Sequence, residues 1–202
     1  DELSGFVTSY GQCVVVKSPE YASEGEIRYI SELFEDAAEA LYSDDGYNSK
    51  GRHFSSYFDM ESFARMYILQ ELAQDSDSDI TSFFLIKPQN TDRLIASPIW
   101  DLDHAFAEKY AYQDLTKHAS YWFANRKTLY RKIGGVDSFL AAAYKQEDFR
   151  AKVRDEWESL RSDSAITNAI HETSVMSERI ISSAVMDAVR WNTYGSRNAD
   201  SC

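Results

Sequence analysis

A low content of cysteine, proline and glycine is the first feature of this sequence, and it narrows what the protein can be. The 202 residues include two cysteines, three prolines and eight glycines. Two cysteines build neither a disulfide framework nor a cysteine-based zinc site. So few prolines and glycines, with 44% hydrophobic residues, indicate a globular chain instead of a disordered one. Cys13 lies in an apolar run, residues 13–16, so we predict that its thiol is buried as a small apolar side chain.

Basic residues are also scarce in comparison with acidic ones. The chain has 21 lysines and arginines against 33 aspartates and glutamates, a formal net charge of −12 at pH 7. A chain this acidic lacks the basic surface that displaces counterions from nucleic acid or docks on anionic lipid. No run approaches the ~20 apolar residues that a membrane-spanning helix needs. We therefore expect neither a nucleic-acid partner nor insertion into a membrane.

The apolar residues that are present suit one well-cored domain, and their spacing is mainly helical. Ser23 and Glu26 fit a capping box at the start of the first helical pattern, and Asp59 can cap a second helix. The segment between these helices, residues 43–56, is rich in Ser, Asp, Gly and Asn and predicts a mobile loop. Three more helical patterns cover about residues 126–133, 137–161 and 164–192. The predicted fold class is α+β and predominantly helical.

Strand-like sequence opens the chain. Residues 1–17 contain two apolar segments separated by Tyr10 and Gly11, and nothing that follows offers these strands an obvious partner. We therefore expect their sheet mates to lie upstream. On this interpretation residues 1–22 are remnant strands of an upstream β-rich lobe, and residues 23–202 form a helical lobe.

Asp101 and Asp103 are the most informative pair of residues. They follow the apolar segment 94–100, which together with residues 80–87 and a turn-rich connection predicts a β-hairpin. Unpaired carboxylates beside a buried strand are costly, and two charges ~4 Å apart repel by roughly 4 kcal/mol at an effective dielectric of 20. Such a pair therefore needs a cation, a basic partner or a raised pKa. Alternatively, Asp103 caps a short helix that starts at His104.

A second acidic cluster, formed by Asp75, Asp77 and Asp79, precedes the hairpin. The hairpin would bring both clusters toward one end of the sheet, which suggests a site for metal and phosphate. The spacing also matches the start of an EF-hand loop, but Ile80 replaces the required Gly and Ile86 replaces the bidentate Glu. A solvated acidic turn is the alternative. The sequence contains no Walker A loop, dinucleotide fingerprint or Gly-x-Ser-x-Gly elbow.

Several segments together resemble the CotH kinase family, a group of atypical protein kinases named for a spore-coat protein. The sequence Ser-Pro-Ile-Trp-Asp-Leu-Asp-His-Ala-Phe at residues 97–106 is similar to the family's Gly-Pro-Val-Trp-Asp-Phe-Asp-x-Ala-Phe. Residues 58–64 resemble its Tyr-Ile-Asp-x-x-Ser-Phe helix start, and Asp77 falls on the Asp of its Asn-x-Asp element. The other segments that carry the resemblance are residues 15–20, 68–72, 149–161 and 188–191.

The resemblance implies a kinase-like C-lobe whose short β-hairpin carries a metal site. Its reaction would be the transfer of the γ-phosphoryl group of ATP to Ser or Thr of a protein substrate, with Mg²⁺ or Mn²⁺. Asp77 would be the catalytic carboxylate and Asp101 a metal ligand, with Asp103 a second metal or structural carboxylate. Asp75 and Lys17 would be weaker contacts to the nucleotide. Members of the family work largely in spore coats or outside the cell, so the resemblance implies an extracellular, cell-surface or spore-coat location.

The sequence departs from the family's pattern in three ways. Asp75 replaces the expected Asn, Ala107 and Glu108 replace the expected Gly and Asn, and the β-rich N-lobe with its nucleotide-binding lysine is missing. We expect this fragment alone to bind ATP poorly, and we expect the upstream N-lobe of the same protein to be a partner. A non-catalytic surface or adhesion module that kept the fold is the alternative function. A third interpretation is a helical domain stabilised by calcium.

Overall fold

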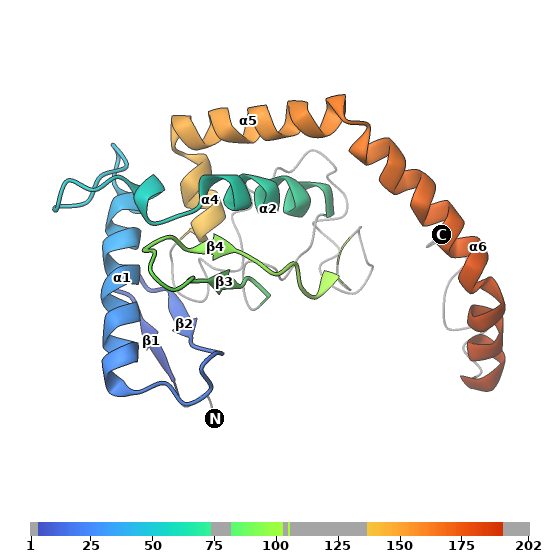
Figure 1. Ribbon diagram of the computed structural model, residues 1–202, viewed down its shortest axis with the longest axis horizontal. Helices are drawn as coiled ribbons and strands as arrows, with labels where there is room; N and C mark the ends of the chain where they lie inside the picture. The colour runs from blue at the N-terminus through green and yellow to red at the C-terminus, as the bar shows by residue number, and fades with distance from the viewer. Residues whose placement is uncertain (1–3, 74–81, 103–104, 106–136, 192–202) are drawn as a thin grey trace. The chain divides into compact units, whose positions relative to one another are not determined.

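The computed structural model describes residues 4–73, 82–102, 105 and 137–191 (Figure 1). The elements are β1 (Gly5–Val7), β2 (Cys13–Val15), α1 (Glu24–Tyr42), the 3₁₀ helix η1 (Phe54–Ser56), α2 (Met60–Ala73), β3 (Leu85–Ile86), β4 (Ile95–Ala96), α4 (Phe139–Tyr144), α5 (Glu147–Ser162) and α6 (Ala165–Trp191). The fold is therefore mostly helical, with two small antiparallel sheets, as the predicted α+β class requires. The helical pattern predicted at 126–133 lies outside the described residues.

The chain divides into two compact units, Asp1–Arg154 and Asp155–Cys202. The division predicted from the sequence, between residues 1–22 and 23–202, stays a prediction. In the second unit, α6 has no buried residue, and apolar side chains such as Ile170, Ile181 and Trp191 are exposed along it. Within the described residues no helix combines the length and the apolar character that crossing a membrane requires.

The N-terminal strands pair with each other as a hairpin, whereas the sequence led us to expect their sheet mates upstream. β1 and β2 are antiparallel, with Gly5 opposite Val15 and Val7 opposite Cys13. Because side chains alternate along a strand, Phe6 faces the core and packs edge-on against Phe34 of α1, with ring centroids 5.6 Å apart. The same alternation turns Cys13 outward, so the prediction of a buried thiol was wrong: Cys13 is exposed.

The core of the first unit lies between α1, α2 and α4. The predicted capping box starts α1: the Glu26 N–H donates to Ser23 Oγ, and the Ser23 N–H donates to the Glu26 carboxylate. The predicted cap of α2 is also confirmed, because the Ser62 N–H donates to Asp59 Oδ1 at 2.9 Å. The largest fully buried side chains of this core are Tyr57, Tyr67, Phe54, Phe58, Phe63, Phe149, Leu41 and Leu94.

The single helix predicted over residues 137–161 is two helices, α4 and α5. The chain leaves α4 at Lys145, and the side chain of Gln146 then turns toward the end of α1. Its Nε2 donates to the backbone oxygens of Leu41 and Ser43, at 3.3 and 2.9 Å. These oxygens lie at the C-terminal end of α1, where carbonyl groups lack partners within the helix. The predicted helix is therefore interrupted at Gln146, whose side chain bonds to these carbonyl groups. The local sequence pattern does not show this contact.

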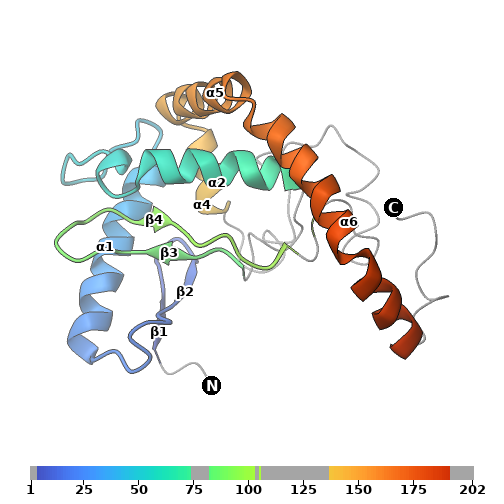
Figure 2. The same ribbon diagram turned by 45° about the vertical axis from the view of Figure 1, so that its right-hand side comes forward.

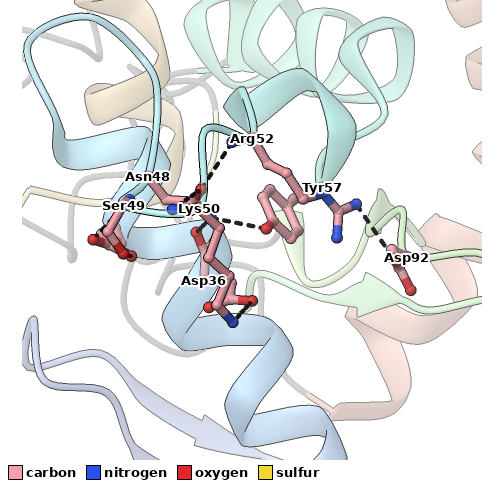
Figure 3. Close-up of polar contacts among 8 residues, drawn as sticks. Asp36, Asn48, Ser49, Lys50, Arg52, Tyr57 and Asp92 are labelled. Carbon is pink, nitrogen blue, oxygen red and sulfur yellow. Dashed lines mark hydrogen bonds and ion pairs between the residues drawn. The ribbon is translucent and has the colours of Figure 1, made fainter.

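The segment 43–56 is a loop, as predicted, but it is built around a buried side chain (Figure 3). Asn48 is 5% exposed, and its amide Nδ2 donates to the Tyr57 hydroxyl at 2.8 Å and to the backbone oxygen of Asp36 at 3.2 Å. Its Oδ1 accepts the backbone N–H groups of Lys50 and Arg52, at 3.1 and 2.9 Å. One amide group therefore joins the loop to α1 and to the residue that follows η1.

Candidate functional site

The second hairpin places the segment that carries the predicted metal ligand Asp101. β3 and β4 are antiparallel, with Leu85 opposite Ala96 and Ile86 opposite Ile95, so the predicted hairpin exists but its strands are short. β4 lies beside α2 in both views of the structure (Figure 1, Figure 2). Ser97 adds one more bond, from its N–H to the Phe84 oxygen at 3.1 Å. Hydrogen bonding between the strands therefore covers only a few residues.

Burial ends at Ala96, which corrects the expectation of a buried strand up to residue 100. Ile99 and Trp100 are each 57% exposed, and Trp100 contacts only the edge of Phe84 among the ring pairs described, at 5.9 Å. The last hydrogen bond described between the two strands is the one from Ser97 to Phe84, so the pairing ends before Ile99 and Trp100. The apolar composition of this segment therefore does not bury it, and Asp101 follows an exposed stretch.

Asp101 is exposed and has a φ angle of 59°, in the left-handed region that few residues other than Gly adopt. Aspartate and asparagine tolerate this conformation better than most side chains. The buried hydroxyl of Ser82 lies 3.5 Å from Asp101 Oδ2, at the long limit of a hydrogen bond. Ser82 precedes β3 and Asp101 follows β4, so the hairpin brings the two side chains together.

The start of α2 is joined to β4 on the side away from β3. Phe58 and Leu94 form a parallel bridge, in which the Asp59 N–H donates to the Leu94 oxygen and the Leu94 N–H donates to the Tyr57 oxygen. The next contact uses a side chain: the Ala96 N–H donates to Ser62 Oγ at 3.1 Å. The segment that leads to Asp101 is therefore held between β3 and the start of α2.

A cleft of about 460 Å³ lies along this junction. Its walls come from the first turns of α2 and from the chain at residues 95–99. The residues that line it are Asp59, Glu61, Ser62, Arg65, Met66, Leu69, Ile95, Ala96, Ser97, Pro98 and Ile99. At its rim Arg65 pairs with Glu61 at 2.6 Å, and Arg93 lies 3.9 Å from Asp59. Asp101 is two residues beyond Ile99, which places their Cα atoms within about 7 Å.

The oxygen atoms of Asp101 and Ser82 are of the kind that Mg²⁺ and Mn²⁺ prefer, so their chemistry fits a hard cation. Within the described residues no three His, Cys, Asp or Glu side chains gather closely enough to hold a metal ion. Three of the predicted site residues, Asp75, Asp77 and Asp103, lie outside the described residues. Lys17 is described, and it is exposed just beyond β2 on the other hairpin.

Tyr67 of α2 is a titratable group that the site does not use. Its ring is buried and stacks on Tyr144 of α4, with centroids 4.6 Å apart. Burial raises the pKa of Tyr67, and the carboxylate of Glu71 one turn later raises it further. The phenol therefore stays protonated at neutral pH.

Sequence reasoning identified Asp101 but missed Ser62, Ser82 and the cleft. Ser82 gave no signal, because one serine at the start of a strand is common. Ser62 gave a weak one, since it stands three residues after the capping residue Asp59 in a segment that resembles a family motif.

Comparison with known sequences gave one match. The sequence model of a family described as CotH kinase protein matches residues 9–201. No curated protein and no solved structure matches the chain significantly.

Proposed function

The chain belongs to the CotH kinase protein family, and from this membership we propose that it is the C-terminal lobe of an atypical protein kinase. The proposed reaction is the metal-dependent transfer of the γ-phosphoryl group of ATP to Ser or Thr of a protein substrate. The observation that carries the proposal is Asp101: an exposed carboxylate, in a left-handed backbone conformation, at the end of the hairpin and next to a cleft. Strained residues of this kind cluster at functional sites.

Each residue of the proposed site has a role that the chemistry of phosphoryl transfer requires. Asp101, with Asp103, would hold Mg²⁺ or Mn²⁺, whose charge offsets the negative charge of the phosphates when it is bound. Asp77 would accept the proton of the substrate hydroxyl, and Ser82 would orient the Asp101 carboxylate. Asp75 and Lys17 would contact the nucleotide. These assignments for Asp75, Asp77 and Asp103 rest on the resemblance of their sequence to the family's motifs.

The cleft is where we propose that the substrate protein lies. Its volume of about 460 Å³ falls within the range of ligand sites, and it combines apolar walls with a polar rim. Met66 and Leu69 offer apolar surface on one side, and Glu61 and Arg65 offer charged groups at the edge. An extended segment of a substrate would lie along residues 95–99, with its hydroxyl group near Asp101.

The outward face of the first hairpin supports the proposal of a partner lobe. Val7 is 64% exposed and Val15 is 39% exposed, and the thiol of Cys13 lies between them on the same face. A two-stranded hairpin with an apolar outer face suits packing against further β structure. We assign this face to a β-rich N-lobe of the same protein, which would supply the nucleotide-binding lysine.

A non-catalytic binding module of a cell surface or spore coat is the second candidate. It is favoured by the sequence at two places: Asp75 stands where the family has Asn, and Ala107 and Glu108 stand where it has Gly and Asn. Such a module would keep the fold without turnover. Both functions are compatible with the location that the resemblance implies, in a spore coat or outside the cell.

Calorimetric titration of ATP with Mg²⁺ or Mn²⁺ into this chain tests the proposal. The variant to compare is Asp101→Asn, because asparagine tolerates a φ angle of 59° while the negative charge is lost. Loss of groups that merely support a metal ligand costs roughly tenfold or more in metal affinity, so loss of the ligand itself should cost at least that. Asp92→Asn is the matched control, since Asp92 lies at the turn of the same hairpin and pairs with Arg52 at 3.2 Å.

We expect metal-dependent binding that is weak in this chain and stronger with the upstream residues of the protein added. In both forms it should be lost in Asp101→Asn and kept in Asp92→Asn, with circular dichroism unchanged. Equal affinity in the Asp101→Asn variant would exclude Asp101 as the metal ligand. If the unmodified chain binds no nucleotide, even with the upstream residues of the protein added, the function as a binding module replaces the kinase proposal.

A further inference from the structure

Asp59 and Ser62 line the cleft and belong to the segment that resembles the family's helix start, yet the proposed reaction gives neither side chain a chemical role. We infer that Ser62 is a positioning residue, which fixes the chain between β4 and Asp101 by holding the backbone N–H of Ala96. The consequence for metal and nucleotide rests on the proposed function of Asp101. The positioning itself does not, because it is a statement about hydrogen bonds within the described residues.

The pairing of β3 with β4 shows why the Ala96 N–H needs a partner. The Ser97 N–H donates to the Phe84 oxygen, so Phe84 and Ser97 are a hydrogen-bonded pair of the antiparallel ladder. Hydrogen-bonded and non-hydrogen-bonded pairs alternate, which makes Leu85 and Ala96 a non-hydrogen-bonded pair. The Ala96 N–H therefore points away from β3, toward α2. Ala96 is 7% exposed, so water does not readily replace a lost partner.

The Ser62 hydroxyl is both a donor and an acceptor at this junction. It donates to the backbone oxygen of Asp59 at 3.0 Å and accepts the Ala96 N–H at 3.1 Å. The directions are fixed, because a carbonyl oxygen only accepts and a backbone N–H only donates. The first bond aims the hydroxyl oxygen, and the second holds the strand. Ser62 thus links the capped end of α2 to β4.

The position of this link explains why it bears on Asp101. The backbone bonds of the Phe58–Leu94 bridge hold the strand at Leu94, and the Ser62 hydroxyl extends that junction by two residues toward Asp101. Beyond Ala96 the contacts described include the bond from Ser97 to Phe84, the ring contact of Trp100 with Phe84 and the long contact between Ser82 and Asp101. Ile99 and Trp100 are exposed and add little packing. Loss of the Ser62 bond should therefore loosen the chain that presents the carboxylate.

Hydrogen–deuterium exchange of the whole chain tests the positioning without any ligand. In Ser62→Ala the hydrogen-bonded amides of Ala96 and Ser97 should exchange roughly two- to tenfold faster, the range that corresponds to the loss of one hydrogen bond. Alanine is a good helix former, so α2 itself should keep its exchange rates. Ser62→Thr keeps the hydroxyl and should restore slow exchange. Thr91→Ala is the matched control, because the Thr91 hydroxyl also accepts a backbone N–H, that of Arg93 at 3.0 Å, in the turn of the same hairpin.

Titration of ATP with Mg²⁺ into the same variants tests the consequence. We expect the affinity to fall roughly tenfold in Ser62→Ala, as for other groups that support a metal ligand, and to recover in Ser62→Thr. Thr91→Ala should bind as the unmodified chain does. Unchanged affinity in Ser62→Ala, beside normal binding by the unmodified chain, would overturn the link from Ser62 to Asp101.

The two measurements separate the failure of this inference from that of the proposed function. Unchanged exchange at Ala96 and Ser97 in Ser62→Ala would overturn the positioning role. An equal rise of the exchange rates in α1 would overturn it too, because that would mean a general loss of stability. Absence of nucleotide binding by the unmodified chain, even with the upstream residues of the protein added, would instead overturn the kinase proposal. The exchange rates would still decide the role of Ser62 in that case.

Discussion

Two segments of the first unit, the polar loop at residues 43–56 and the apolar stretch at residues 97–100, have the reverse of the burial that their compositions suggest. The loop is rich in Ser, Asp and Gly, yet it buries Asn48 and Phe54. The stretch contains Ile99 and Trp100, yet both are more than half exposed. The first is enclosed by α1 and by the chain around Tyr57, whereas the second leaves a hairpin whose paired strands have already ended.

The comparison shows that burial follows the hydrogen bonds and packing that surrounding elements offer. Asn48 can be buried because both ends of its amide find partners, so its desolvation is compensated. Ile99 and Trp100 would gain free energy from burial, but the pairing of β3 with β4 ends before them. Composition alone therefore assigns each of these segments to the wrong environment.

The largest expected effect on stability comes from comparing two substitutions to alanine in the same segment of the chain. Leu94 is 1% exposed and Ile99 is 57% exposed, five residues apart. Leu94→Ala should lower the free energy of unfolding by about 3 kcal/mol, because it leaves a cavity in the core. Ile99→Ala should change it by less than about 0.5 kcal/mol, as an exposed position does. Urea unfolding followed by circular dichroism measures both, and similar losses would show that Ile99 is buried in solution.

The next effect tests the polar loop. Asn48→Ala removes the bonds to Tyr57, Asp36, Lys50 and Arg52 and leaves buried groups without partners, so we expect a loss of about 2 kcal/mol in the free energy of unfolding. Ser49→Ala is the matched control: its hydroxyl bonds to a carboxylate on the exposed surface, and the loss should be below about 0.5 kcal/mol. If both variants unfold at the same urea concentration, the buried amide does not hold this loop.

The smallest effect concerns the start of α1 and depends on pH. Hydrogen bonds from the Ser23 hydroxyl, and then from the Ser23 backbone, lower the pKa of Glu26. A group whose pKa is lowered by folding stabilises the folded state above its unfolded pKa of about 4.3, and that contribution disappears as the pH falls through the lower folded pKa. Glu26→Gln should therefore melt slightly below the unmodified chain at pH 7, and the difference should shrink below about pH 4.3.

Melting curves between pH 3 and pH 7 measure this difference. Glu24→Gln is the control, since Glu24 lies in the same first turn of α1. A difference between Glu26→Gln and the unmodified chain that stays constant over this range would mean that the capping carboxylate contributes nothing through its charge.

The parts of the fold that were predicted from the sequence depend on contacts between residues close together in the chain. The capping box of Ser23 and Glu26 joins residues three apart, and the predicted β3–β4 hairpin joins two neighbouring segments of the chain. The errors came from contacts over long separations. The break between α4 and α5 depends on Gln146 reaching Leu41, 105 residues away. The exposure of Cys13 depends on which face of its hairpin meets α1.

The candidate site divides in the same way. Asp101 was identified because a pair of aspartates after an apolar segment is unusual and resembles a family motif. Ser62 and Ser82 were not identified, because the role of each serine depends on which atom its hydroxyl group contacts in the folded chain. Ser62 meets Ala96 across 34 residues, and Ser82 meets Asp101 across 19. No local pattern of residues encodes either contact.

The sequence by itself determined the family, the mainly helical α+β class, the caps of α1 and α2 and the existence of the β3–β4 hairpin. It did so because family motifs, helix caps and short turns depend on residues that are close together in the sequence. Only the tertiary structure decided that Asn48 is buried, that Ile99 and Trp100 are exposed, and that Ser62 holds the strand before Asp101. Burial and hydrogen-bond partners depend on which distant elements pack together, and that packing is a property of the folded chain.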